Sequence, residues 1–192
     1  MPANPRHFAT HEAGHAVIQW FVGWESELKK IQMRLVEGGA TDAIMHVIPP
    51  EVQTLSAARS RLLVLYAGSV ASNTRFSTNW SDFHKDWNLA LTVTASYLKL
   101  HNLEWCPSDG WSVKNREANA ILQDTWIKAD EIVNHSTLVT TIDAVATLLF
   151  DAQPDGKGLC VIYGPEVTDT CERLFGPELR HNNQWSHWLN GL

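Results

Sequence analysis

Residues 8–21 read FATHEAGHAVIQWF and form the clearest structural signal in the chain. Apolar side chains recur in this stretch at the spacing of one helix face, namely Ala13, Ala16, Val17, Trp20 and Phe21. Thr10 stands where a side chain caps the first turn of such a helix. We therefore predict a helix over residues 8–21.

The rest of the chain predicts a mainly α fold. Residues 30–35 and 43–48 alternate between apolar and polar, and Pro49 and Pro50 end the second stretch, which is typical of a β-hairpin. Helical patterns cover 54–74, 79–100, 113–134 and 137–151, and an apolar run at 159–163 precedes a weaker helical pattern at 165–175. We expect a multi-helix fold with one small β-hairpin sheet, forming a single domain over residues 1–192.

The composition and charge of the chain exclude several classes of protein function. The 192 residues are 44% hydrophobic and 19% charged, as in globular proteins. A net charge of −6 without a basic run argues against a nucleic-acid partner, and the apolar run at 62–67 is too short for a membrane span. Three scattered cysteines and the absence of a signal-like leader predict a cytoplasmic protein.

The residues that carry chemistry are His11, Glu12 and His15, an HExxH match inside the predicted helix. Positions i and i+4 share one helix face, so the two histidines can bind a single zinc ion. Glu12, one residue further round, reaches a water molecule at the metal and can act as general base. The alternative is that these are ordinary polar residues on the solvated side of an amphipathic helix. Gly14 favours the zinc site, because a glycine inside a helix usually implies close approach of another backbone, from the hairpin or a substrate strand.

A hydrolytic zinc site needs a third protein ligand, for which we select Asp82. It lies at the start of the predicted 79–100 helix, where an aspartate is also favoured as a cap. Asp86, one turn later, and the nearby His84 are the alternatives. The spacing of these residues does not distinguish among the three.

The motif resembles that of a known family. The stretch 11–17 is similar to the zinc motif of FtsH-type metallopeptidases, the protease domains of membrane-anchored AAA proteases. Residues 44–49 resemble the family's hairpin strand ending in proline, and residues 66–71 its Ala-Gly-x-x-Ala helix. Ser81-Asp82 with Leu89-Ala90 resembles its Asn-Asp segment, whose aspartate is the third zinc ligand, which favours Asp82 over Asp86. The resemblance covers about residues 7–175 and leaves 176–192 as a C-terminal tail.

This resemblance implies a zinc-dependent endopeptidase that cleaves unfolded or flexible polypeptides. In the family, the substrate lies against an edge strand beside the metal, and residues 43–48 are the corresponding segment here. Main-chain pairing along such an edge binds peptides without reading much of their sequence. The alternative is that the hairpin is purely structural.

Three departures from the family limit what the resemblance implies. Trp80 and Ser72-Asn73 stand where the family usually has a small residue and an acidic pair. The chain also lacks a phosphate-binding loop, because Gly156-Lys157-Gly158 has neither the spacing nor the hydroxyl residue. We therefore expect a standalone, ATP-independent peptidase without a membrane anchor, and leave its number of subunits open. The alternative function is a catalytically silent binding or assembly module that acts with a partner AAA ATPase.

Overall fold

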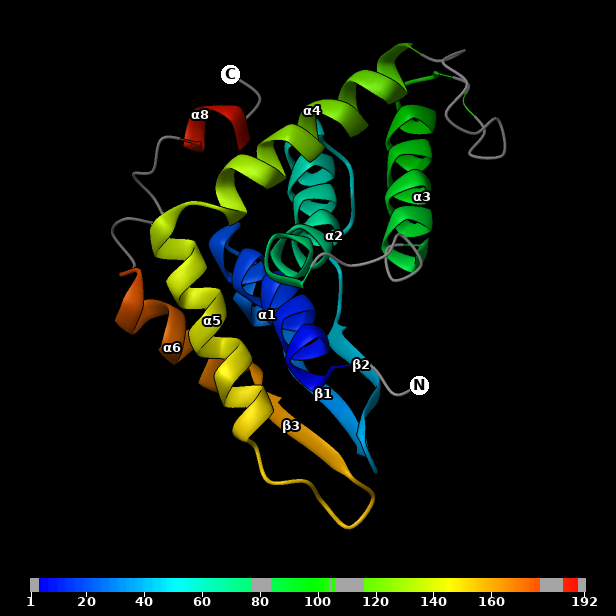
Figure 1. Cartoon of the computed structure of the whole chain (residues 1–192). Helices are drawn as coiled ribbons and strands as arrows, with labels where there is room; N and C mark the ends of the chain where they lie inside the picture. The colour runs from blue at the N-terminus through cyan, green and yellow to red at the C-terminus, as the bar shows by residue number, and fades with distance from the viewer. Residues whose placement is uncertain (1–3, 77–83, 104, 106–115, 177–184, 190–192) are drawn as a thin grey trace.

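The computed structural model describes residues 4–76, 84–103, 105, 116–176 and 185–189 (Figure 1). Its elements, in chain order, are α1 (Pro5–Phe21), a short 3-10 helix (Glu25–Glu27), β1 (Leu28–Val36), β2 (Gly39–Val47), α2 (Leu55–Phe76), α3 (His84–Leu100), α4 (Arg116–Val133), α5 (Ser136–Asp151), β3 (Leu159–Tyr163), α6 (Gly164–Leu174) and α8 (Ser186–Leu189). The prediction of a mainly α protein with a small sheet is confirmed.

Helix α1 begins earlier than the hydrophobic pattern predicts. The side-chain oxygen of Asn4 accepts a hydrogen bond of 2.9 Å from the backbone N–H of Arg6, and Pro5 occupies the first turn. Both features are typical of a helix start. Thr10, which we expected to cap the helix, instead lies buried inside it. The prediction of its capping role was wrong because the apolar pattern starts about one turn after the N-terminus of the helix.

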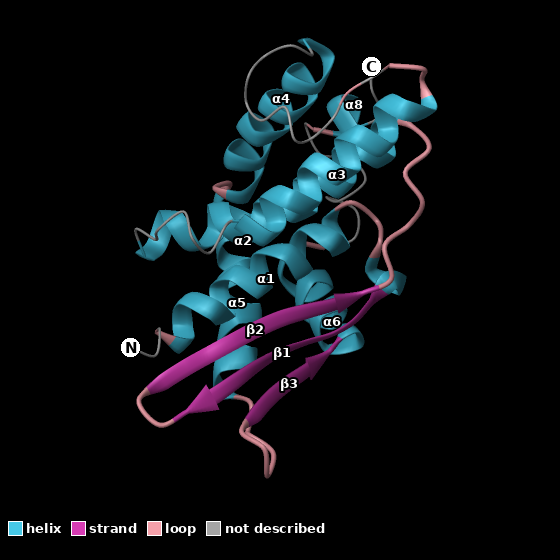
Figure 2. Cartoon of the chain, turned by 90° about the vertical axis from the view of Figure 1, so that its right-hand side faces the viewer, coloured by secondary structure: helices cyan, strands magenta, loops and turns pink. Residues whose placement is uncertain are grey.

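The sheet contains the predicted hairpin and one additional strand. β1 and β2 pair antiparallel around a turn in which Gly38 has a φ of 86°, a conformation that favours glycine. β3, the apolar run near the C-terminus, pairs antiparallel with the other side of β1. The strand order is therefore β2-β1-β3, with β2 at an edge (Figure 2).

Helix α1 packs tightly against α2. A Cβ atom added to Gly14 would lie 2.7 Å from the backbone oxygen of Ala67 and 2.9 Å from the Cβ of Ala71, so no larger residue fits without a shift of one helix. The close backbone approach predicted at Gly14 is present, but the neighbouring backbone belongs to α2 rather than to the hairpin or a substrate. This packing places the motif face of α1 beside the middle of α2.

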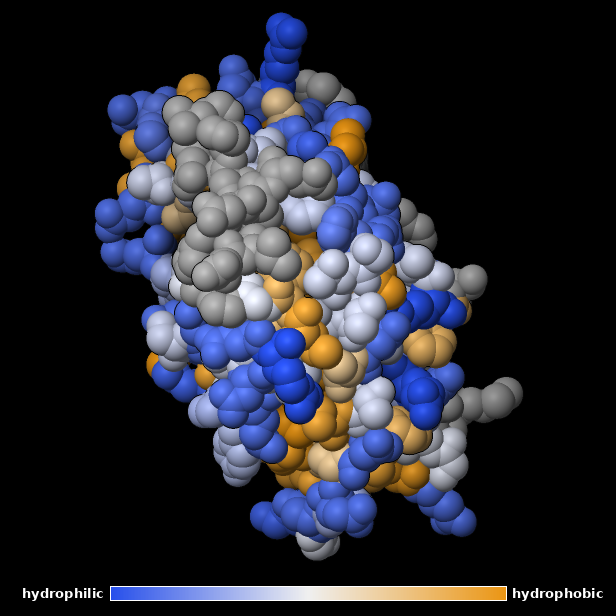
Figure 3. All heavy atoms as spheres, turned by 90° about the vertical axis from the view of Figure 1, so that its left-hand side faces the viewer, coloured by the Kyte–Doolittle hydropathy of each residue, from blue (hydrophilic) through white to orange (hydrophobic). Residues whose placement is uncertain are grey.

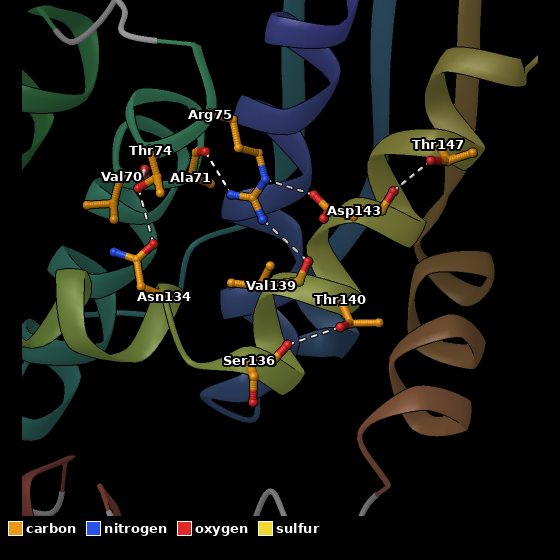
Figure 4. A network of polar contacts seen from close by, with 10 residues as sticks. All are labelled: Val70, Ala71, Thr74, Arg75, Asn134, Ser136, Val139, Thr140, Asp143 and Thr147. Atoms are coloured by element: carbon orange, nitrogen blue, oxygen red, sulfur yellow. Dashed lines mark hydrogen bonds and ion pairs between the residues drawn. The ribbon is translucent and has the colours of Figure 1, made fainter.

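A network of polar contacts joins the C-terminal end of α2 to α5 (Figure 4). Arg75 donates from Nε to Asp143 at 2.8 Å, and from its two terminal nitrogens to the carbonyl oxygens of Ala71 at 2.9 Å and Val139 at 3.4 Å. Every donor group in these contacts meets an oxygen acceptor. The network therefore satisfies a largely buried guanidinium and ties two helices together.

The C-terminal tail docks on the helices. Trp185 is buried and donates from its indole nitrogen to Glu131 at 2.8 Å, while Trp188 donates to Asp124 at 2.9 Å. Arg59 of α2 donates to the backbone oxygen of Trp188 at 3.1 Å. The described part of the tail, residues 185–189, thus packs against α4 and α2.

Figure 3 shows the side of the molecule on which α5 and α6 lie, with an interrupted band of apolar residues bordered by hydrophilic ones. Leu148 on α5 and Leu174 on α6 are each 39% exposed. Exposed apolar side chains of this kind are ordinary on protein surfaces. Among the helices that the structure describes, none is by itself long and apolar enough to cross a membrane, although α4 and α5, bent by 79° at their junction, pass the same length and composition test as a pair.

Candidate metal centre

Three side chains from two helices converge on one point. His11 and His15 lie one turn apart on α1, and their Nε2 atoms are 3.1 Å apart. Asp86, in the first turn of α3, places Oδ2 at 3.2 Å from the Nε2 of His11 and 3.3 Å from that of His15. The three ligand atoms therefore form a nearly equilateral triangle.

The size of this triangle fits zinc. In a tetrahedral site with metal–ligand distances of about 2.0–2.1 Å, neighbouring ligand atoms are about 3.3 Å apart. Two imidazoles and one carboxylate are also a donor set that zinc accepts. The observed separations of 3.1–3.3 Å match this requirement.

The hydrogen bonding of His15 presents a lone pair to the centre of the triangle. Its Nδ1 lies 2.7 Å from the backbone oxygen of Val64, which can only accept, so Nδ1 carries the hydrogen and Nε2 of the neutral ring is free to coordinate. Asp86 Oδ2 is buried, and its closest polar neighbours among the described residues are the Nε2 atoms of His11 and His15. Three atoms that can each bind a metal ion thus lie around one point.

A glycine on α2 makes room for the imidazole of His15. A Cβ atom added to Gly68 would lie 2.3 Å from the Nε2 of His15, so the ring rests directly on the α2 backbone. Val64 and Gly68 lie one turn apart on that helix. Gly68 contacts one face of the ring, and the carbonyl oxygen of Val64 contacts its Nδ1. Both residues position the imidazole, and neither contributes an atom to the triangle.

The charges of the three ligands stabilise one another. Burial alone would lower the pKa of His15, but Asp86, Glu12 and the Val64 carbonyl together outweigh burial and raise it from 6.5 to about 9. Burial opposes ionisation of Asp86, yet the two histidines hold the pKa of its carboxyl well below its usual range. The carboxylate is therefore ionised at neutral pH and supplies a negative ligand.

Glu12 lies beside the triangle rather than in it. Its side chain is only 6% exposed, and this burial raises its pKa against the lowering effect of both histidines. The backbone N–H of Met45 on β2 also favours the ionised carboxylate and so lowers this pKa. The burial of Glu12 and His15 argues against the alternative that these are solvated polar residues on a helix surface.

The three ligands and Glu12 share a cavity of about 480 Å³. Helix α1, the edge strand β2, the middle of α2 and the start of α3 form its walls. The lining residues are His7, Phe8, His11, Glu12, His15, Asp42, Ala43, Ile44, Met45, Val47, Arg61, Val64, Leu65, Lys85, Asp86 and Leu89. A mostly apolar cavity with a few polar groups that converge is typical of a ligand site.

The structure places His11, Glu12 and His15 at one cavity, and Asp86 is the third residue of a group that could hold a metal ion. Asp82, the residue selected from the sequence, lies outside the described residues. A signal for Asp86 is present in the chain: it stands four residues before Ala90, and eight before Thr94, on the buried stripe of α3. The role of Val64 had no sequence signal, because a backbone carbonyl carries no residue identity.

The site was compared with known proteins through the sequence of the chain. No protein-family model matches the sequence, and the curated proteins contain no significant match.

Proposed function

We propose that the protein is a zinc-dependent metallopeptidase of the FtsH type, which hydrolyses flexible polypeptides without ATP and acts in the cytoplasm. The observation that carries the proposal is the triangle of His11, His15 and Asp86 with Glu12 beside it. Zinc bound by these ligands would supply a Lewis acid that lowers the pKa of water and polarises a carbonyl group.

Glu12 is suited to move the proton. A general base must be largely deprotonated yet able to hold a proton during the reaction, and burial of Glu12 shifts its pKa upward in the required direction. In the proposed reaction its carboxylate takes a proton from the attacking water and passes it to the leaving amine. Met45 of β2 lines the same cavity, and its backbone N–H favours the ionised form of this carboxylate.

The edge strand provides a place for the peptide. β2 borders the cavity through Ala43, Ile44, Met45 and Val47 and pairs only with β1 within the described sheet. An extended peptide that pairs with such an edge is held through its main chain. Such a peptide would lie beside the metal ligands, which favours broad specificity for unfolded chains.

The test is cleavage of fluorescently labelled casein without ATP by zinc-loaded wild-type protein and by Glu12→Gln. We expect turnover in the wild type and a loss of at least about 100-fold in the variant, as for removal of a general base, with the zinc content of both measured. Glu172→Gln, at an exposed position on α6, is the matched control and should retain full activity.

The outcomes separate the proposal from its alternative. Equal turnover by wild type and Glu12→Gln would contradict the assigned base. Absence of turnover from zinc-loaded wild type would overturn the peptidase proposal and favour a binding module that acts with an AAA ATPase.

A further inference from the structure

Helix α2 carries three arginines, and they differ in how their charges are satisfied. Arg75 makes the three contacts described above. Arg59 donates to Trp188 O, approaches Asp124 Oδ2 at 3.4 Å and stacks 5.2 Å from the ring centre of Trp188. Arg61, two residues after Arg59, has no hydrogen bond or ion pair with the residues that the structure describes, and its Nη1 atom is buried.

Arg61 lines the cavity that holds the metal ligands. Burial lowers the pKa of its guanidinium, which the negative charge of Asp86 partly opposes. A partly buried cation without a hydrogen-bond partner is costly, because the interactions it loses with water are not replaced. An anionic ligand in the cavity would replace them, and a guanidinium binds carboxylates in particular through paired N–H groups.

The other charges of the cavity favour an anion when the metal is bound. Among the lining residues that the structure describes, the acidic ones are Glu12, Asp86 and Asp42, and the basic ones besides the histidines are Arg61 and Lys85. The two positive charges of zinc would offset Glu12 and Asp86. Arg61 and Lys85 then outnumber Asp42, so the cavity has an excess of positive charge.

We propose that Arg61 binds a carboxylate of the peptide, and that this contact selects acidic substrates at the cavity beside the metal ligands. This inference rests on the proposed function in that the ligand is taken to be a peptide. The carboxylate has two sources, the side chain of Asp or Glu and the C-terminus of the chain. Arg61 is a specificity-determining residue in either case.

The experiment measures binding rather than turnover, on zinc-loaded Glu12→Gln protein. The probes are acetylated six-residue peptides of Ala and Leu with one Glu at each position in turn, and their Gln counterparts, each made as a C-terminal acid and as an amide. We expect acidic peptides to bind roughly 10- to 100-fold more tightly than their neutral counterparts, as for a hydrogen bond to a charged group. A preference that depends on Glu position identifies a side chain, and one that depends only on the free terminus identifies the C-terminal carboxylate.

Three variants assign the preference to this residue. Arg61→Gln should abolish it while leaving the zinc content unchanged, and Arg61→Lys should restore part of it because the charge is retained. Arg173→Gln, the same change at an exposed position of α6, should leave it intact. Three results would overturn the inference. They are equal binding of acidic and neutral peptides when Arg61 is present, no binding of acidic peptides at millimolar concentration, and an unchanged preference in Arg61→Gln. Acid-selective binding without cleavage by the Glu12-containing protein would refute the peptidase proposal and leave this one standing.

Discussion

Two polar clusters, one around Arg75 and one around His15, involve helices α1 and α2. They differ in how their polar atoms are paired. Around Arg75, N–H donors meet the oxygens of Ala71, Val139 and Asp143, so the cluster is satisfied by protein atoms alone. Around His15, the Nε2 atoms of two imidazoles and Oδ2 of Asp86 lie within 3.3 Å of one another. The first arrangement stabilises the fold. The second brings together three atoms that can bind a metal ion, which is why it indicates a function.

The largest expected effect separates the two clusters directly. Asp86→Ala removes one of the three proposed metal ligands, and we expect zinc affinity to fall by more than the roughly 10- to 100-fold that loss of a supporting residue costs. Asp143→Ala removes an aspartate from the satisfied cluster and should leave zinc affinity unchanged. Competition with a chromophoric chelator measures both, and retention of tight zinc binding by Asp86→Ala would show that this residue is not a ligand.

The second effect tests the support given to His15 by α2. Gly68→Ala places a Cβ atom against the imidazole, so the ring must move away from its position over the helix backbone. We expect zinc affinity to fall roughly 10- to 100-fold, as for loss of a group that orients a ligand. Gly156→Ala is the matched control, because a Cβ atom there meets nothing within 4 Å; equal zinc affinities for the two variants would argue against the proposed role of Gly68.

The third effect is a pH dependence of zinc binding at His15. The cluster around Arg75 should show no such dependence. In the metal-free protein the pKa of His15 is raised from 6.5 to about 9, so below pH 9 the bound proton must leave before Nε2 can coordinate zinc. The apparent dissociation constant should therefore rise about tenfold for each unit by which the pH falls from 8 to 7, if one proton is displaced. Chelator competition at several pH values measures this slope, and a flat profile would mean that no proton competes with the metal.

Much of the fold and of the candidate site could be predicted from the sequence, because local patterns of residues determine them. The spacing of His11 and His15 places both imidazoles on one face of a helix whatever surrounds it, and the hairpin and helices follow from apolar periodicity. The choice between Asp82 and Asp86 depends on where α3 begins and which face it buries, which is decided by packing against α2. The pairing of β3 with β1, and the absence of a partner for Arg61 within the described part of the chain, depend on contacts between distant segments. Neither leaves a local pattern to be read.

The smallest expected effect lies in the satisfied cluster itself. Asp143 is more than half exposed, with 54% of its side chain accessible, whereas Arg75 is 17% exposed. Such a pair contributes about 0–1 kcal/mol, and in Asp143→Ala the guanidinium keeps its two carbonyl acceptors on α2 and α5. We therefore expect the free energy of unfolding in urea, measured with chelator present, to fall by about 0.5 kcal/mol. Arg75→Ala, which removes all three contacts, should cost more than Asp143→Ala. If the two variants were equally stable, the ion pair rather than the carbonyl contacts would be what joins α2 to α5.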